Sequence, residues 1–329
     1  MRILVLGGTS FVGRAIVDDA LRAGAEVTLF SRGQTGAELF PGLERRTGDR
    51  ATGDYAALAG GSWDAVVDVS GYVPRHVREA AGALGDRIGR YLFISTGSVY
   101  DVSAAPSDGM DEDSPRLASE RDTEDITGDT YGPLKVACED DVRSIFGERA
   151  TVVRPGIVAG PHDPTDRFTY WVRRAALGGR VAVPARPDQP VQVVNSGDLA
   201  RLVTRLLTDD RAGIYNAVGP AEPTTLAGLV ATCAEAAGTT VEIVAVPPDP
   251  ELPLVLAEPS WDPMFRRSAA RAYAAGMPAT PLIRTAADVL AWDRDRGAPP
   301  LSAGLTTERE AALLAEASAA GDTVGPGSR

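Results

Sequence analysis

The stretch Gly7-Gly8-Thr9-Ser10-Phe11-Val12-Gly13 decides the fold of this chain. It directly follows the apolar run Ile3–Leu6 and opens the stretch Gly13–Ala23, whose apolar residues recur at helical spacing. A glycine-rich turn between a strand and a helix brings backbone N–H groups together at the helix N-terminus, where the helix dipole favours a pyrophosphate. This context predicts a dinucleotide-binding turn, with Ser10 in a middle position where glycine is usual.

Short apolar runs alternate with helical patterns through the first half of the chain. Because these runs are apolar throughout, they fit strands that are covered on both faces. The predicted strands are Ile3–Leu6, Glu26–Phe30, Ala65–Val69, Tyr91–Ser95 and Thr151–Arg154. Their βαβα order predicts an α/β protein with a Rossmann-type, doubly wound parallel sheet. We assign residues 1–160 to this dinucleotide-binding domain.

The second half has the pattern of a smaller C-terminal α+β substrate lobe over residues 161–320, which returns some strands and helices to the main sheet. Its predicted elements are the strands Val191–Val194, Ile214–Val218 and Val241–Val246 and the helices Asp198–Leu207, Thr225–Ala237 and Thr307–Ala319. Residues 321–329 are predicted to form a disordered tail. The acidic connection 102–129 is either a functional lid or a disordered surface segment.

A carboxylate is missing at the end of the second predicted strand, where NAD sites usually carry one for the ribose 2′-hydroxyl. The residues there are Ser31 and Arg32. Arginine suits a 2′-phosphate through its charge and its fork of donors. We therefore predict NADP as the preferred cofactor, with NAD as the other option. In the alternative, Arg32 only stacks on the adenine.

The chain has a single lysine, Lys135, four residues after Tyr131. Residues i and i+4 share one face of a helix, so the two side chains can converge on one ligand. A phenol titrates at about pH 10, but a neighbouring ammonium stabilises the phenolate and lowers the pKa of the phenol. Pro133 is tolerated if the helix begins near Tyr131. The pair predicts acid/base chemistry; the alternative is a surface lysine at chance spacing.

Together with Ser95-Thr96-Gly97-Ser98-Val99-Tyr100, these stretches resemble the extended short-chain dehydrogenase/reductase family, also called the NAD-dependent epimerase/dehydratase family. The resemblance covers residues 1–160 and is looser beyond them. It implies that Tyr131 is the acid/base, that Lys135 holds the nicotinamide ribose and that Thr96 binds the reacting oxygen. The cofactor contacts that we expect are Gly7, Thr9, Ser10, Phe11, Val12, Gly13, Ser31, Arg32, Asp49, Ser70, Gly71, Lys135 and Pro155.

The chain departs from the family's nucleotide-sugar enzymes at three places. Gly97 and Ser98 stand where the dehydratases carry two acids, which argues against that elimination. Ile157 stands where the epimerases carry an asparagine, and Val191-Gln192-Val193 replaces their Arg-Asp-Tyr/Phe sequence. These losses favour a less charged ketone, aldehyde or alcohol as substrate. The candidate substrate contacts are Tyr72, Ser98, Ile157, Phe168 and Trp171.

Composition limits the remaining options. The net charge of −12 disfavours nucleic acid and anionic membranes as partners, and no segment approaches the roughly 20 apolar residues of a membrane span. Two cysteines and two histidines outside any metal-binding motif predict no metal site and a reducing, cytoplasmic compartment. We expect a small-molecule substrate, and a homodimer only by analogy with the family.

Three functions remain open at this point. The first is an NADPH-dependent reductase of a small ketone or aldehyde, or the reverse alcohol dehydrogenase, which Arg32 and the Tyr131–Lys135 pair favour. The second is an NAD(P)-dependent sugar or nucleotide-sugar epimerase, in which the cofactor is reduced and regenerated within one turnover. The third is a non-catalytic cofactor-binding or RNA-associated protein, which the acidic charge balance opposes.

Overall fold

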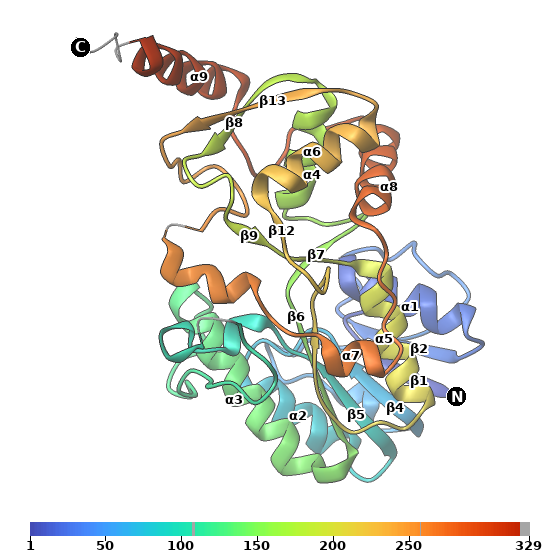
Figure 1. The fold of residues 1–329 in the computed structure, drawn as a ribbon. Helices are drawn as coiled ribbons and strands as arrows, with labels where there is room; N and C mark the ends of the chain where they lie inside the picture. Colours follow the sequence, from blue (N-terminus) through green and yellow to red (C-terminus); the bar gives the residue numbers. More distant parts are fainter. Residues whose placement is uncertain (107–108, 257, 323–329) are drawn as a thin grey trace.

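The computed structural model describes residues 1–106, 109–256 and 258–322 (Figure 1). At its centre is a parallel 7-stranded sheet with the order β11-β6-β5-β4-β1-β2-β3. The strand order reverses at β1, so the carboxyl ends of β1, β2 and β4 border a crevice that suits a ligand. The strands are β1 (Arg2–Leu6), β2 (Glu26–Ser31), β3 (Glu44–Thr47), β4 (Trp63–Asp68), β5 (Ile88–Ile94), β6 (Ala150–Pro155) and β11 (Gly213–Ala217).

Helices cover both faces of this sheet (Figure 1). One face is covered by α1 and α5, which pack on each other, and the other face by α2 and α3. Side chains alternate along β1, so that Ile3 and Val5 join one of these cores while Leu4 and Leu6 join the other. The predicted doubly wound α/β fold is confirmed. The helices are α1 (Phe11–Arg22), α2 (Pro74–Leu84), α3 (Gly128–Phe146) and α5 (Ser196–Thr208).

The second lobe has its own apolar core. Its helices are α4 (Arg167–Ala176), α6 (Leu226–Ala237), α8 (Leu282–Asp295) and α9 (Thr307–Asp322). Its strands pair as β7 (Ile157–Ala159) with β10 (Val193–Asn195), β8 (Gly179–Pro184) with β13 (Val241–Val246), and β9 (Pro190–Val191) with β12 (Thr224–Thr225). Three elements from this half of the chain, α5, β11 and α7 (Ala270–Ala274), pack in the first lobe instead. No helix in the described part of the chain is long and apolar enough to cross a membrane.

The predicted strands and helices are present, most with ends shifted by a few residues. β13 has the predicted bounds. β3 was not predicted, because its sequence Glu-Arg-Arg-Thr has no apolar pattern; it lies at the sheet edge, where charged residues are common. The stretch predicted as one strand from Val191 to Val194 forms two, β9 and β10, interrupted at Gln192.

Two predicted helix limits were wrong. α3 begins at Gly128 because Thr127 and Thr130 cap it reciprocally: each hydroxyl accepts the backbone N–H of the other residue, at 2.9 and 3.2 Å. Pro133 therefore lies inside the helix and not in its first turn. α9 continues to Asp322, so residues 321 and 322 are helical; residues 323–329 of the predicted tail lie outside the described residues.

The acidic connection is anchored to the protein at Met110, while most of its residues from 118 to 129 are exposed. Met110 joins Val99, Tyr100 and Val136 in a small apolar core. Its backbone also bridges to Arg267 near the C-terminal half of the chain. The connection therefore joins the region after β5 to the distant segment around Arg267.

Candidate active site

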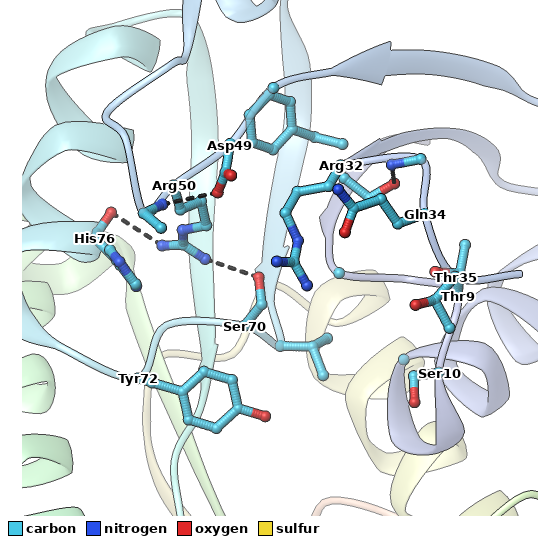
Figure 2. A pocket seen from close by; sticks show the side chains of 18 of the residues that line it. Thr9, Ser10, Arg32, Gln34, Thr35, Asp49, Arg50, Ser70, Tyr72 and His76 are labelled. Atoms are coloured by element: carbon cyan, nitrogen blue, oxygen red, sulfur yellow. Dashed lines mark hydrogen bonds between the residues drawn. The ribbon is translucent and has the colours of Figure 1, made fainter. Parts of the chain in front are cut away.

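A groove of about 620 Å³ lies at the carboxyl ends of β1, β2 and β4 (Figure 2). The glycine-rich turn and the loops after β2, β3 and β4 form its walls. Of the expected cofactor residues, ten line it: Gly7, Thr9, Ser10, Phe11, Val12, Gly13, Ser31, Arg32, Asp49 and Ser70. Gly71, Lys135 and Pro155 do not, and the last two line a neighbouring cavity instead.

The glycine-rich turn can hold a dinucleotide because two of its positions are glycine. A side chain at Gly7 or Gly13 would collide with neighbouring atoms of the turn. Gly7 has a φ of +93°, and a Cβ there would lie 2.8 Å from the Cβ of Ser70. A Cβ on Gly13 would collide with the carbonyl oxygen of Gly7. Ser10 makes no side-chain hydrogen bond to the start of α1, so no side chain of its own caps the first N–H groups of that helix. These groups are placed to bind a phosphate.

Arg32 is exposed at the end of β2, and its side chain reaches over the groove (Figure 2). Ser31 shapes the turn below it by accepting the N–H of Gly33 at 3.2 Å. The carboxylate of Asp49 accepts the N–H of Ala51 at 2.9 Å and so closes the turn after β3. The groove therefore presents the guanidinium of Arg32 close to where the second strand ends.

Arg50 and Asp68 form a buried ion pair that the sequence did not reveal. Arg50 donates to both oxygens of Asp68, at 2.6 and 2.9 Å. It also donates to the hydroxyl of Ser70 at 2.9 Å and to the carbonyl of His76 (Figure 2). Tyr91 donates to the same carboxylate at 2.6 Å. These contacts fix the loop after β4 against the groove. Nothing local in the sequence marks Arg50 as buried.

A second cavity, of about 310 Å³, adjoins the groove, because Val12, Val69 and Tyr72 line both. It brings together all three expected catalytic residues, from the end of β5 and from α3. The expected residues on its wall are Val12, Tyr72, Thr96, Ser98, Tyr131, Lys135, Pro155 and Ile157. Residues that were not expected there include Arg167, Met264, Phe265 and Arg267.

Tyr131 and Thr96 are neighbours on the wall of this cavity. Burial raises the pKa of Tyr131, while a hydrogen bond with the Thr96 side chain and the charge of Arg167 act in the opposite direction. Thr96 also accepts the N–H of Ser98 at 3.1 Å, which caps the short helical turn after β5. The threonine hydroxyl is therefore held beside the phenol.

Lys135 lies on the same side of α3 as Tyr131, but its ammonium is bound to the backbone. It donates to the carbonyl oxygens of Gly71 and Ile94, at 2.8 and 2.7 Å, and lies 4.1 Å from the centre of the Phe93 ring. An ammonium has three donors, so one remains for a ligand. Burial lowers the pKa of Lys135 to about 8.

We expected the ammonium of Lys135 and an oxidised nicotinamide together to lower the pKa of Tyr131. Burial is the largest influence on this pKa and raises it, and the effect of the nicotinamide stays a prediction. Lys135 turns two of its donors toward the carbonyl of Ile94, at the end of β5, and that of Gly71, in the loop after β4. It therefore supports the cavity wall as well as facing the cavity.

Phe168 and Trp171 were predicted as substrate contacts, and the structure contradicts this. They are 1% and 0% exposed and belong to the core of the second lobe. The indole N–H of Trp171 donates to the carbonyl of Pro253 at 3.0 Å. The aromatic-rich segment forms α4, whose apolar side is turned inward to α6 and α8.

Arg154, which precedes Pro155, has a structural role. Its guanidinium donates to both oxygens of Glu139, at 2.9 and 2.7 Å, and both residues are almost fully buried. Ser95 donates to the same carboxylate at 2.6 Å. This network joins β5, β6 and α3, the three elements that carry Thr96, Pro155 and the Tyr131–Lys135 pair.

The middle of the chain carries a family signature. Residues 64–218 match the model of the NAD dependent epimerase/dehydratase family. This match supports the resemblance predicted from the motifs. The matched segment is similar to the NAD-dependent epimerase/dehydratase family, which supports an NAD(P)-dependent enzyme of the extended short-chain dehydrogenase type.

Solved structures share the fold. The UDP-glucuronic acid 4-epimerase of Bacillus cereus, solved in complex with NAD, is 14% identical, with a TM-score of 0.67 over 90% of this chain and 99% of that one. The UDP-glucose 4-epimerase of Thermus thermophilus, also solved with NAD, is 21% identical, with a TM-score of 0.65 over 91% and 100%. These likenesses support a shared fold.

One curated relative has a name of another kind. The chloroplast stem-loop binding protein of 41 kDa b of Arabidopsis thaliana is 26% identical over 254 residues. The alignment covers 72% of this chain and 63% of that protein. The chain therefore spans somewhat less than two thirds of this relative.

Proposed function

We propose that this protein is an NAD(P)-dependent epimerase that inverts a secondary alcohol carbon of a sugar. The observation that carries the proposal is the second cavity, where Thr96, Ser98, Tyr131 and Lys135 gather beside the dinucleotide groove. Hydroxyl groups on its wall suit a ligand with many hydroxyls, because each can both donate and accept. The name of the matched family and the epimerases among the structural neighbours support the same class.

The carbonyl reductase that we expected first has less support than this alternative. Both reactions need an acid/base beside the reacting carbon, so the Tyr131–Lys135 pair does not distinguish them. The matched family and the neighbours described above are named for epimerases and dehydratases. Epimerisation is therefore the better-supported use of the site.

The residues of the cavity have defined roles in this reaction. A bound nicotinamide would supply reversible two-electron oxidation of the alcohol carbon and, when oxidised, a positive charge that favours a neighbouring phenolate. Tyr131 would take the proton of the substrate hydroxyl as its carbon is oxidised and return it on reduction. Thr96 would donate a hydrogen bond to the same substrate oxygen and so stabilise the negative charge that this oxygen carries in the transition state. Lys135 would use its remaining donor for the ribose of the cofactor.

We also propose NADP as the preferred cofactor. The end of β2 offers Ser31 and Arg32 instead of a carboxylate, and Arg32 extends over the groove. A guanidinium would attract a 2′-phosphate, whereas a ribose hydroxyl gains little from it.

The substrate that we propose is a sugar without a nucleotide. Ile157 lines the cavity at the place where an asparagine was expected for a sugar nucleotide. Gln192, which replaces the expected Arg-Asp-Tyr lead, is 1% exposed and uses its amide on other parts of the chain. Neither side chain offers a charge to a diphosphate.

The test is to incubate purified protein with a catalytic amount of NAD or NADP and a panel of free sugars, sugar acids and nucleotide sugars. Products are identified by proton NMR, and the redox state of the cofactor is followed by its absorbance. We expect an epimer to form with no net change in reduced cofactor. Stoichiometric consumption of NADPH with simple ketones or aldehydes, and no epimer, would overturn the proposal and favour the reductase.

A second candidate, RNA binding, is favoured only by the name of the Arabidopsis relative. The net charge of −12 opposes it, because affinity for RNA depends largely on neutralised phosphates. Filter binding of a stem-loop RNA at physiological salt tests it. We expect no saturable binding tighter than about 1 μM.

A further inference from the structure

Arg267 is a buried cation on the wall of the second cavity. The residue is 4% exposed, and its Nε and Nη1 atoms have no hydrogen-bond partner among the described residues. Burial lowers the pKa of Arg267 to about 10, still far above neutrality, so the guanidinium keeps its charge. A buried charge without a partner is costly, and its presence calls for an explanation.

The guanidinium lies beside the catalytic residues. Its Nη1 occupies the space that a Cβ on Gly97 would need, and its Nη2 lies 3.0 Å from the position of a Cβ on Gly156. Both glycines line the cavity, and Gly97 directly follows Thr96. The charge therefore faces the space next to the hydroxyl that would bind the reacting oxygen.

The position of Arg267 is built into the fold. Gln192 accepts the backbone N–H of Arg267 at 2.9 Å and donates to its backbone carbonyl at 3.0 Å. A backbone bridge to Met110 also holds this residue. Two distant segments, around residues 110 and 192, thus fix the backbone of one buried arginine.

The acids of the neighbouring elements are engaged elsewhere. Glu139 binds Arg154 and Ser95, as described above. Glu112 accepts the N–H of Asn216 at 2.8 Å and pairs with Arg271. Neither carboxylate is paired with Arg267.

The cavity as a whole is cationic in an acidic protein. Its wall carries Lys135, Arg167 and Arg267, and no aspartate or glutamate is among the described residues that line it. The net charge of the chain is −12, so this local reversal of sign does not follow from composition. Fixed cations in a small, partly enclosed site attract anions more strongly than they would in water.

We propose that Arg267 binds an anionic group of the substrate, a carboxylate or a phosphate, a few bonds from the carbon that reacts. The proposal rests on the function proposed above and narrows it to a sugar acid or a sugar phosphate. A planar guanidinium with unused donors matches either oxyanion in charge and geometry. The anion would accept hydrogen bonds from the Nε and Nη1 atoms of Arg267, which have no partner among the described residues.

The test compares binding of three probes that differ in charge: D-glucose, D-glucuronate and D-glucose 6-phosphate. Each is titrated calorimetrically into protein saturated with NADP. We expect one of the two anionic probes to bind about 10- to 100-fold more tightly than glucose, and the Arg267→Met variant to lose that difference. The probe that binds more tightly shows whether the anionic group of the substrate is a carboxylate or a phosphate.

Arg266 provides the matched control, because it is the neighbouring arginine but is exposed and outside the cavity. Arg266→Met should keep the preference for the anion. Equal binding of all three probes to the wild-type protein, or an anion preference that survives Arg267→Met, would overturn the proposal. Because the calorimetric measurement needs no turnover, a negative result for anion binding can be told apart from a negative result in the epimerase assay.

Folding of the variant is checked by its melting temperature without ligand. Removal of an unpaired buried charge should leave that temperature unchanged or raise it. A large fall would show that Arg267 serves the fold, and would count against a ligand-binding role. Arg267→Lys, which keeps the charge but not the fork of donors, should retain only part of the preference.

Discussion

Arg50 and Asp68 are joined by two hydrogen bonds, of 2.6 and 2.9 Å, directly beside the dinucleotide groove. The carboxylate is 0% and the guanidinium side chain 9% exposed. The pair holds Ser70, whose own hydroxyl donates to the carbonyl of Leu6 at 3.1 Å. The ion pair thus links the ends of β1 and β4 to the loop after β3.

Asp68→Asn should destabilise the protein strongly, because it leaves a buried guanidinium without its counter-charge. We expect the free energy of unfolding to fall by about 3–5 kcal/mol, measured by urea denaturation. Asp288→Asn is the control, since it removes an exposed pair with Arg284 and should cost less than about 0.5 kcal/mol. Equal losses in the two variants would contradict the structural role.

The same pair has a pH signature. Burial alone would raise the pKa of Asp68, but the charge of Arg50 and the hydrogen bonds to the carboxylate outweigh it and lower this pKa below its ordinary value. The folded state therefore binds a proton less readily than the unfolded chain, and the contribution of the pair is present above about pH 4 and lost as the pH falls further. The free energy of unfolding of the wild-type protein should drop across this range more steeply than that of Asp68→Asn.

Tyr131→Phe should remove the proton donor and acceptor while leaving the cofactor groove intact. We expect turnover to fall by about 10²- to 10⁴-fold and the dissociation constant for NADP to change little. Tyr215→Phe is the control, because its hydroxyl donates to the carbonyl of Ala212 outside both cavities. A Tyr131→Phe enzyme with near-native turnover would exclude the phenol from the reaction.

Lys135 should impose an alkaline limit on activity. Its folded pKa of about 8 lies below that of free lysine, so the ammonium donor is lost as the pH rises through 8. We expect the rate to fall above that pH. In Lys135→Arg the limit should vanish, because a guanidinium stays charged, but the rate should be low since its planar fork does not fit between the carbonyls of Gly71 and Ile94.

The sign for stability is opposite to the sign for activity. Between about pH 8 and 10 the unfolded chain binds more protons at this lysine than the folded protein does. Folding therefore becomes more favourable at this site as the pH rises through that window. A fall in both rate and stability above pH 8 would mean that unfolding, not loss of the ammonium, limits activity.

Arg32→Ala should weaken NADP much more than NAD. Loss of a charge-assisted contact with a 2′-phosphate corresponds to about a 10- to 100-fold rise in the Michaelis constant for NADP, with little change for NAD. Arg284→Ala, on the exposed side of α8, is the control. Equal changes for the two cofactors would assign Arg32 to the adenine, and a wild-type preference for NAD would refute the cofactor proposal.

Gly97→Ala should disturb the cavity without disturbing the groove. A methyl group there would collide with the guanidinium of Arg267 and force it to move. We expect turnover to fall by at least about tenfold and the NADP dissociation constant to stay within about twofold. Gly60→Ala, where a Cβ meets no atom within 4 Å, should be silent in both assays.

Much of the fold was predictable because burial leaves local marks. The strands β1, β4 and β5 are covered on both faces, so their residues form continuous apolar runs. The glycines of the phosphate turn are needed by the backbone itself and so stand out in the sequence. Tyr131 and Lys135 are linked by helical spacing, which places them on one side of α3 without tertiary information.

What could not be predicted depends on contacts between distant segments. Arg50 and Arg267 look like ordinary surface charges beside Asp49 and Arg266, and only the tertiary fold shows that they are buried. Trp171 was misassigned because the sequence alone does not distinguish an aromatic residue in a loop at the site from one buried on the inner side of a helix. The cavity's positive sign also required the fold, since its three cations come from 135, 167 and 267.

The turn from Met264 to Arg267 reaches the cavity without being part of the sheet or of the helix that carries Tyr131. Under the proposals above, the anion-binding arginine and the proton-transferring tyrosine belong to separate parts of the polypeptide. Substitutions in the turn would then alter the preference for the substrate anion without changing the helix that carries Tyr131.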